Sequence, residues 1–212
     1  MIRAQSTYNF LNKKYDELPF AGAWYDAFDK PEPRGTWFVY GDSGNGKTSF
    51  LQQMAMYFDE ELKMRVAYMS LEEAGRRSFQ RSARRAGWKE KGSLIQVLPP
   101  AGPDELDEWL EKHNQTKLVI IDTVNYWILK YGFSTTRYFE LREKYPDKIF
   151  VYMSHVKGNE PDRAIAVDIM RDADLKIFIQ GFRAISKGRD IGSKGHYSIW
   201  PEREAKIWLT EK

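Results

Sequence analysis

The stretch that decides the fold is Gly41-Asp42-Ser43-Gly44-Asn45-Gly46-Lys47-Thr48, which matches the pattern GxxxxGK[ST] at every position. It directly follows residues 36–40, an apolar run of aromatic and β-branched side chains that is typical of a buried strand. After Lys47, apolar residues recur with helical spacing, at Phe50, Met54, Tyr57 and Phe58. A strand, a glycine-rich loop and a helix in this order predict a loop that binds phosphate.

The residue types of this loop suit a triphosphate. Glycines let the chain turn tightly, so that successive backbone N–H groups point at phosphate oxygens. We expect Lys47 to contact the β- and γ-phosphates and the Thr48 hydroxyl to ligate Mg²⁺. The expected nucleotide-binding residues are Gly41, Asp42, Ser43, Gly44, Asn45, Gly46, Lys47, Thr48 and Ser49.

The rest of the chain alternates between expected strands and helices. The strands are expected at 65–70, 94–98, 118–121, 149–153 and 175–179, with one helix over 72–86 and another opening at Pro103. Residues 183–209 read as short β segments broken by glycines. This order predicts an α/β fold, a mostly parallel β-sheet flanked by helices with a short C-terminal β extension. We divide the chain into an N-terminal lead-in segment, residues 1–34, and one nucleotide-binding domain, residues 35–212.

Composition excludes several classes of site. The 212 residues include no cysteine and only three scattered histidines, so a disulfide framework, a thiolate zinc site and a cysteine nucleophile are ruled out. A net charge of +3 is compatible with nucleic acid but does not identify a partner. Neither a membrane-spanning run nor a secretory signal is visible, so we expect a cytoplasmic protein with no membrane partner.

Carboxylates follow two of the expected strands. Asp122 ends the apolar run 118–121, and Glu72 and Glu73 follow the strand 65–70. Because carboxyl ends of neighbouring parallel strands meet at one edge of a sheet, Asp122 is expected to be the carboxylate ligand of Mg²⁺. A carboxylate after the strand 65–70 could polarise the water that attacks the γ-phosphate. Acids at a helix N-terminus, favoured by the helix dipole, are the competing interpretation.

Ser70-Leu71-Glu72 after the second strand resembles the RecA superfamily of ATPases, particularly the core of the hexameric DnaB-type helicases. The resemblance implies an ATPase that uses ATP and Mg²⁺, with Glu72 as the catalytic glutamate. Glu73 also resembles the paired acids of the KaiC-like branch, so both remain candidates.

Two later segments extend the resemblance. Met153-Ser154-His155 stands where the family has a polar sensor of the γ-phosphate, commonly glutamine, which implies that role for His155. Ser186-Lys187-Gly188-Arg189 resembles the Lys-x-Arg segment by which family members reach the nucleotide of the neighbouring subunit. The resemblance therefore implies a ring or filament of identical subunits. The implied catalytic set is Lys47, Glu72, Asp122, His155, Lys187 and Arg189.

Three segments bear on single-stranded nucleic acid. Residues 125–133 mix aromatics with a lysine and could stack on bases, or could pack as a hydrophobic segment. Residues 156–163 stand where the family carries its second DNA loop. Arg77, Arg81, Arg84 and Arg85 fall on one side of the expected helix, with Lys89 and Lys91 beyond it, and form either a solvated face or a phosphate-binding stripe.

These observations leave three functions open. The leading hypothesis is a RecA-type ATPase acting on single-stranded DNA in recombination, repair or replication, with ATP at subunit interfaces. The second is a nucleotide or small-molecule kinase that uses the arginine-rich stretch 76–85 as a lid. The third is a KaiC-like module that uses ATP to assemble or regulate and does not bind DNA.

Overall fold

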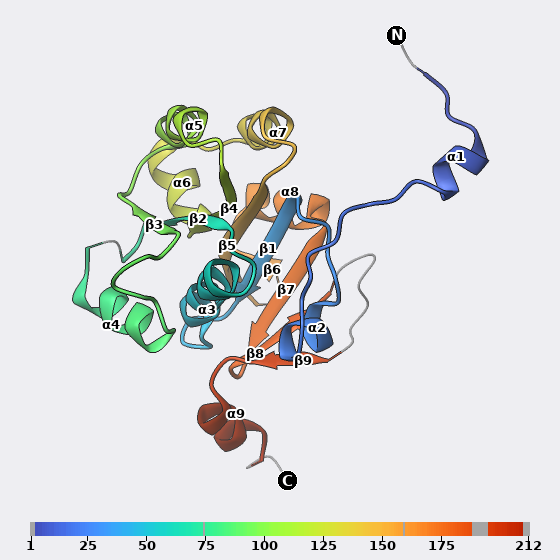
Figure 1. Ribbon diagram of the computed structural model, residues 1–212. Coiled ribbons are helices and arrows are strands. Elements are labelled where there is room, and N and C mark those ends of the chain that lie inside the picture. Colours follow the sequence, from blue (N-terminus) through green and yellow to red (C-terminus); the bar gives the residue numbers. More distant parts are fainter. Residues whose placement is uncertain (1–2, 74, 159, 188–194, 210–212) are drawn as a thin grey trace.

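The protein folds around one twisted sheet, seen in a computed structural model that describes residues 3–73, 75–158, 160–187 and 195–209. The strand order is β3-β2-β4-β5-β1-β7-β8-β9, with β6 paired to β5 (Figure 1). The strands are β1 (Gly35–Gly41), β2 (Arg65–Ser70), β3 (Ile95–Leu98), β4 (Thr116–Asp122), β5 (Ile149–Lys157), β6 (Glu160–Pro161), β7 (Leu175–Gln180), β8 (Arg183–Ser186) and β9 (His196–Ser198).

Six of these strands, from β3 to β7 in the sheet order, pair in parallel, and β8 and β9 continue the sheet antiparallel. The helices are α1 (Thr7–Leu11), α2 (Ala23–Phe28), α3 (Lys47–Glu60), α4 (Arg77–Arg85), α5 (Pro103–Lys112), α6 (Val124–Tyr131), α7 (Thr135–Lys144), α8 (Ala164–Asp172) and α9 (Pro201–Trp208). The expected α/β architecture with a short C-terminal β extension is confirmed.

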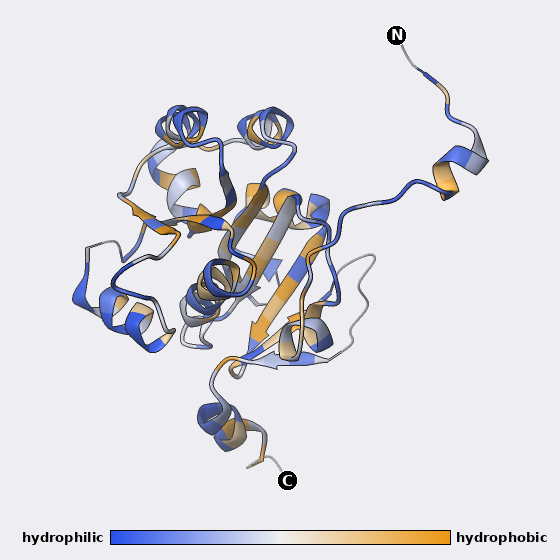
Figure 2. Cartoon of the chain, in the orientation of Figure 1, coloured by the Kyte–Doolittle hydropathy of each residue, from blue (hydrophilic) through white to orange (hydrophobic). Residues whose placement is uncertain are grey.

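The sheet is covered on both faces. Residues of α2, α3 and α4 pack with Trp37 and Val39 on one face, whereas residues of α5, α6, α7 and α8 pack with Phe38 and Tyr40 on the other. Side chains alternate between the two faces of a strand, so a strand covered on both faces must be apolar throughout. Figure 2 shows this as hydrophobic strands behind helices whose outward sides are hydrophilic.

The register of the parallel strands brings their carboxyl ends together. Gly41 pairs with His155 on β5 and with Ile179 on β7. Asp122 pairs with Ser70 on β2 and with Met153 on β5. The loop after β1 therefore starts beside the ends of β4, β5 and β7, which is where open parallel sheets bind ligands.

Part of the N-terminal lead-in belongs to the core. Leu18, Phe20, Trp24 and Phe28 are buried, and the Phe20 ring lies edge-on to Tyr57 on α3, with ring centres 5.4 Å apart. Residues before about 16 run away from the body and carry the short helix α1 (Figure 1). The structure thus joins residues 18–28 to the face of the sheet that α3 covers.

Two expected boundaries were wrong. The helix expected over 72–86 begins only at Arg77, because residues 71–73 and 75 are in turns. The Glu73 N–H donates there to Ser70 Oγ, and the Arg76 N–H donates to the Glu73 carbonyl. The tail expected as β segments ends in the helix α9. Pro201 in its first turn, with acids there and Lys206 in its last turn, favours a helix at this position.

The two segments considered as nucleic-acid loops have regular structure. Residues 125–131 lie in α6, where Trp127 is fully buried, and Phe133 beyond it is buried as well. Val156 and Lys157 end β5, and they pair antiparallel with the short strand β6. The burial of Trp127 and Phe133 agrees with the packing interpretation of the first segment. Among the described residues, no helix has the length and apolar character needed to cross a membrane.

Candidate nucleotide site

The glycine-rich loop joins β1 to α3, and residues 42–44 within it are exposed. Lys47, the first residue of α3, is only 5% exposed, and its Nζ donates a hydrogen bond to the Asp42 carbonyl at 2.8 Å. The lysine is thus folded back over the loop. Burial lowers the pKa of Lys47, and the nearby Asp122, Asp42 and Glu72 carboxylates oppose that effect. A phosphate in the loop would supply further negative charge to this lysine.

Close approaches explain why the loop contains glycine. A Cβ on Gly41 would lie 2.2 Å from the Ile179 carbonyl oxygen, a backbone atom that cannot swing away. Gly46 has a φ of +99°, and a Cβ there would lie 3.0 Å from Cδ1 of Phe182. Asn45 fixes the other side, since its Oδ1 accepts from the Gly181 N–H at 2.7 Å. The loop is therefore held against the turn that joins β7 to β8.

Asp122 and Thr48 meet at the edge of the loop. Asp122 is 3% exposed, and its Oδ2 accepts a hydrogen bond from the Tyr68 hydroxyl at 2.8 Å. Burial raises the pKa of Asp122 to about 7. The carboxylates of Glu72 and Glu73 add to that rise, and hydrogen bonds from Tyr68 and the Thr48 hydroxyl oppose it. A cation at this point would stabilise the charged carboxylate that burial disfavours.

The donor set fits Mg²⁺ bound together with a nucleotide. Thr48 and Asp122 offer a hydroxyl and a carboxylate, and Mg²⁺ in such sites keeps several waters and takes phosphate oxygens as further ligands. Across the described residues, no three acidic, histidine or cysteine side chains gather as a metal cage. A Mg²⁺ site of this kind does not need three protein ligands, because phosphate oxygens and waters would supply the remaining ones.

Glu72 and Glu73 point to different neighbours. Glu72 Oε2 lies 3.3 Å from His155 Nε2, which joins the ends of β2 and β5. Glu73 Oε2 instead accepts from the Ser78 hydroxyl of α4 at 3.4 Å. The geometry therefore favours Glu72 over Glu73 as the carboxylate that faces the site.

Two polar partners of the site were missed in the sequence. Asn125 Oδ1 accepts from the His155 N–H at 3.2 Å, and Tyr68 holds Asp122 as described above. Both residues could have been found from the sequence, because each is a polar residue in a segment that is expected to be buried. A tyrosine inside a buried strand needs a partner for its hydroxyl, and a buried asparagine needs partners for its amide.

Lys187, the first residue of the Lys-x-Arg segment, lies away from the loop of its own chain. β8 runs antiparallel to β7, and the N–H of Lys187 donates to the Lys176 carbonyl, near the start of β7. Lys187 is exposed, with its Nζ 4.4 Å from the centre of the Phe178 ring. Arg189 lies outside the described residues. A contact of Lys187 with a nucleotide would therefore have to be made in a neighbouring subunit.

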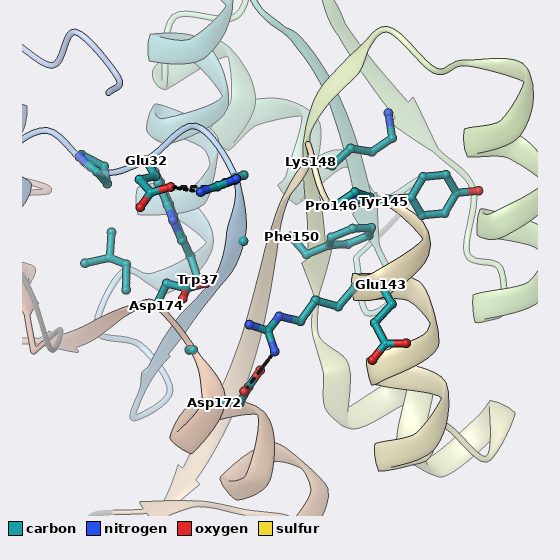
Figure 3. A pocket seen from close by; sticks show the side chains of 15 residues that line it. Glu32, Trp37, Glu143, Tyr145, Pro146, Lys148, Phe150, Asp172 and Asp174 are labelled. Atoms are coloured by element: carbon teal, nitrogen blue, oxygen red, sulfur yellow. Dashed lines mark hydrogen bonds and ion pairs between the residues drawn. The ribbon is translucent and has the colours of Figure 1, made fainter. Parts of the chain in front are cut away.

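A cavity of about 510 Å³ lies at the opposite edge of the sheet (Figure 3). It opens at the beginnings of β1, β5 and β7, where Trp37, Phe150 and Leu175 line it together with ion-paired residues such as Arg142 and Asp172. This edge is separated from the loop by the length of β1. The cavity is not part of the nucleotide site.

Comparison with known proteins bears on the fold. No protein-family model matches the chain, and neither does any curated protein. Among solved structures, a KaiC-like protein from the hyperthermophilic archaeon Pyrococcus horikoshii matches with a TM-score of 0.58 and 19% sequence identity, covering 79% of this chain and 82% of that one. The chain has a KaiC-like fold. The expected resemblance is therefore confirmed at the level of the fold.

Proposed function

We propose that the protein is a Mg²⁺-dependent ATPase of the RecA type. One observation carries the proposal: the buried Lys47, the Thr48–Asp122 pair and the Glu72–His155 pair all meet at the ends of adjacent strands around one phosphate-binding loop. These groups supply phosphate binding, metal binding and a carboxylate for the attacking water, which are the parts that phosphoryl transfer to water requires.

Each side chain has a separate task in this reaction. The loop N–H groups and Lys47 bind the phosphates, and Thr48 and Asp122 hold Mg²⁺, which neutralises charge on the β- and γ-phosphate oxygens when it is bound. Glu72 accepts a proton from the water that attacks the γ-phosphorus. His155 keeps the Glu72 carboxylate in place and donates a hydrogen bond to the transferred phosphoryl group.

We further propose that the active form is a homo-oligomer with ATP at the subunit interface. Lys187 lies far from the loop of its own chain, so it can act on ATP only from a neighbour. Arg189 is assigned the same task by the Lys-x-Arg pattern. Charge supplied across an interface in this way can raise the rate about 10³–10⁵-fold. Hydrolysis per subunit should therefore rise with protein concentration.

Single-stranded nucleic acid is the proposed partner of this assembly. Its support is α4, where Arg77, Arg81 and Arg84 are exposed opposite the buried Phe79. Arg84 forms an ion pair with Glu90 at 3.6 Å, whereas within the described residues neither Arg77 nor Arg81 forms one, so these two are available for phosphates. Binding through such arginines should weaken steeply with salt, because counterions are released from the nucleic acid.

A KaiC-like assembly module without nucleic-acid binding is the second candidate. The folding of residues 125–131 into α6 and the antiparallel pairing of β6 with the end of β5 favour it. The kinase alternative is weakened, because α4 is anchored in the core by Phe79 and Ala83 and is not placed as a free lid.

Phosphate release tests these proposals together. We expect Mg²⁺- and ATP-dependent release that increases with protein concentration and with added single-stranded DNA, and no release from Lys47→Ala. Lys112→Ala, an exposed lysine on α5, is the matched control and should hydrolyse ATP normally. Release without any effect of DNA would favour the assembly module. The ATPase proposal would be wrong if well-folded protein bound no ATP, or transferred phosphate to a nucleoside acceptor instead of water.

A further inference from the structure

The turn between β7 and β8 has an unusual backbone conformation. The two strands are joined by only two residues, Gly181 and Phe182, whose φ angles are +52° and +63°. Tight hairpin turns of type I′ need positive φ at both central residues, and glycine, asparagine and aspartate are the usual residues there. Phenylalanine is an outlier in this region because its side chain is bulky. The surrounding structure must therefore hold the turn in place, and residues held in this way are concentrated at functional sites.

One side of this turn contacts the phosphate-binding loop. The Gly181 N–H donates to Asn45 Oδ1 at 2.7 Å. Because a backbone N–H can only donate, this bond decides which end of the Asn45 amide faces the turn. The other end, Nδ2, lies 3.4 Å from the Asp42 carbonyl, which also accepts the hydrogen bond from Lys47. The turn therefore acts on the part of the loop that would contact phosphate.

The other side of the turn contacts α9, which lies below β8 in Figure 1. The Trp208 Nε1 donates to the Gly181 carbonyl at 3.1 Å, and a Cβ on Gly181 would lie 2.7 Å from the same nitrogen. The Arg183 guanidinium carbon lies 4.2 Å from the centre of the Trp208 ring. Arg183 is itself held by Glu204 on α9, whose Oε1 accepts from the Arg183 Nε at 2.7 Å. Gly181 thus donates to the loop and accepts from α9.

We propose that α9 positions the phosphate-binding loop, with Trp208 as the positioning residue and Gly181 as its link to Asn45. The inference rests on the proposed nucleotide binding and adds a residue that acts on the loop without touching the nucleotide. A loop that is already held in its binding conformation loses less freedom when the ligand binds, and it therefore binds more tightly. Loss of the Trp208 contact should weaken the binding of phosphates, whether or not they carry a nucleoside.

Calorimetric titration with Mg²⁺-ADP and with Mg²⁺-tripolyphosphate, which has phosphates but no nucleoside, tests this. Trp208→Phe keeps an aromatic ring but lacks the N–H donor, and it should weaken the binding of both ligands about 2- to 10-fold, the range for loss of one hydrogen bond. Trp208→Ala, which also removes the ring, should weaken both at least as much. Trp109→Ala truncates a half-buried tryptophan on α5, and as the matched control it should leave both affinities within about twofold.

A double-mutant cycle separates positioning from a general loss of stability. In an Asn45→Ala background the link from the turn to the loop is already absent, so Trp208→Phe should change either affinity less than about twofold. Three results would overturn the inference and leave the phosphate site intact: an unchanged affinity in Trp208→Phe, an equal loss in both backgrounds, or a loss of ADP binding with tripolyphosphate binding unchanged. If the unaltered protein bound neither ligand, the proposed function would fail together with this inference.

Discussion

At the scale of single residues, the site is defined by contacts between side chains from different strand ends. Glu72 and Glu73 illustrate this, because they are neighbours in the sequence but their carboxylates contact different residues. Glu72 contacts His155, and Glu73 accepts a hydrogen bond from Ser78. Successive residues in a turn point in different directions, so a one-residue step decides whether a carboxylate faces the nucleotide or the next helix. Such a pair provides a matched comparison.

We predict that Glu72→Gln lowers ATP turnover about 10²–10⁴-fold, the usual contribution of a general base, with ATP binding retained. Glu73→Gln should stay near the original rate, because its carboxylate is directed at α4. Steady-state phosphate release and nucleotide titration of both variants provide the measurement. A larger loss in Glu73→Gln than in Glu72→Gln would reverse the assignment.

A second prediction concerns His155. Glutamine can hydrogen-bond both to Glu72 and to a phosphoryl oxygen, whereas alanine can do neither. His155→Gln should therefore retain most of the turnover that His155→Ala loses, at unchanged ATP affinity. Equal rates for the two variants in the same phosphate-release assay would mean that the side chain makes no contact that matters to hydrolysis.

At the scale of elements, α6 shows how an aromatic segment is used for packing. Trp127 is fully buried, its Nε1 donates to the Ala101 carbonyl at 2.8 Å, and its ring centre lies 4.9 Å from that of Phe133. Leu129 on the same helix is 60% exposed. The helix thus has a buried side that holds it against the sheet and a side that contributes little to stability.

Trp127→Ala should lower the free energy of unfolding by about 3–5 kcal/mol, as expected for truncating a buried aromatic side chain. Leu129→Ala should change it by less than about 0.5 kcal/mol. Urea unfolding followed by circular dichroism measures both. If Trp127 instead served nucleic acid by stacking, the alanine variant would keep its stability and lose binding, which the burial of this ring contradicts.

Most elements could be predicted from the sequence because their signals are local. The loop motif, the apolar run ending in Asp122 and the opening of α5 at Pro103 each lie within a few residues. What could not be predicted depends on residues distant in the chain. Tyr68 on β2 contacts Asp122 on the neighbouring strand β4, 54 residues further along the chain, and Trp200 contacts Arg85 although more than a hundred residues separate them. The start of α4 was misjudged because hydrogen bonds within residues 70–76 compete with the helix there.

At the scale of the whole molecule, stability at acid pH depends on charged groups that tie helices together. Asp107 on α5 accepts hydrogen bonds from Arg137 on α7, from Lys144 at the end of α7, and from Tyr145 just beyond it. Burial raises the pKa of Asp107, but the hydrogen bonds from Lys144, Tyr145 and Arg137 outweigh it and hold the pKa below the ordinary value of 3.8. A carboxyl with a lowered folded-state pKa stabilises the fold above its unfolded-state pKa.

We therefore predict that Asp107→Asn lowers the free energy of unfolding at pH 7 by about 1.5–3 kcal/mol, the usual value for hydrogen bonds to a charged group. The difference should shrink as the pH falls below about 4, because the original aspartate then becomes protonated and loses the same stabilisation. Asp104→Asn is the control, since Asp104 pairs with the same Arg137 but is 84% exposed, and should cost less than about 1 kcal/mol. Urea unfolding of the original protein and of both variants at pH 7 and at pH 3 measures these free energies. If Asp107→Asn lowered the free energy of unfolding as much at pH 3 as at pH 7, this account would be contradicted.

The ends of the sheet have a consequence for how copies of this chain can associate. In the described part of the chain, the sheet terminates in β3 and β9, strands of four and three residues. Such short outer strands present few free N–H and C=O groups, so they are poor templates for adding a strand from another molecule. The long apolar strands each lie between two neighbouring strands. As edge strands they would be prone to amyloid-like stacking. Association between copies should therefore use side-chain surfaces, which can form and separate while the sheet of each copy stays intact.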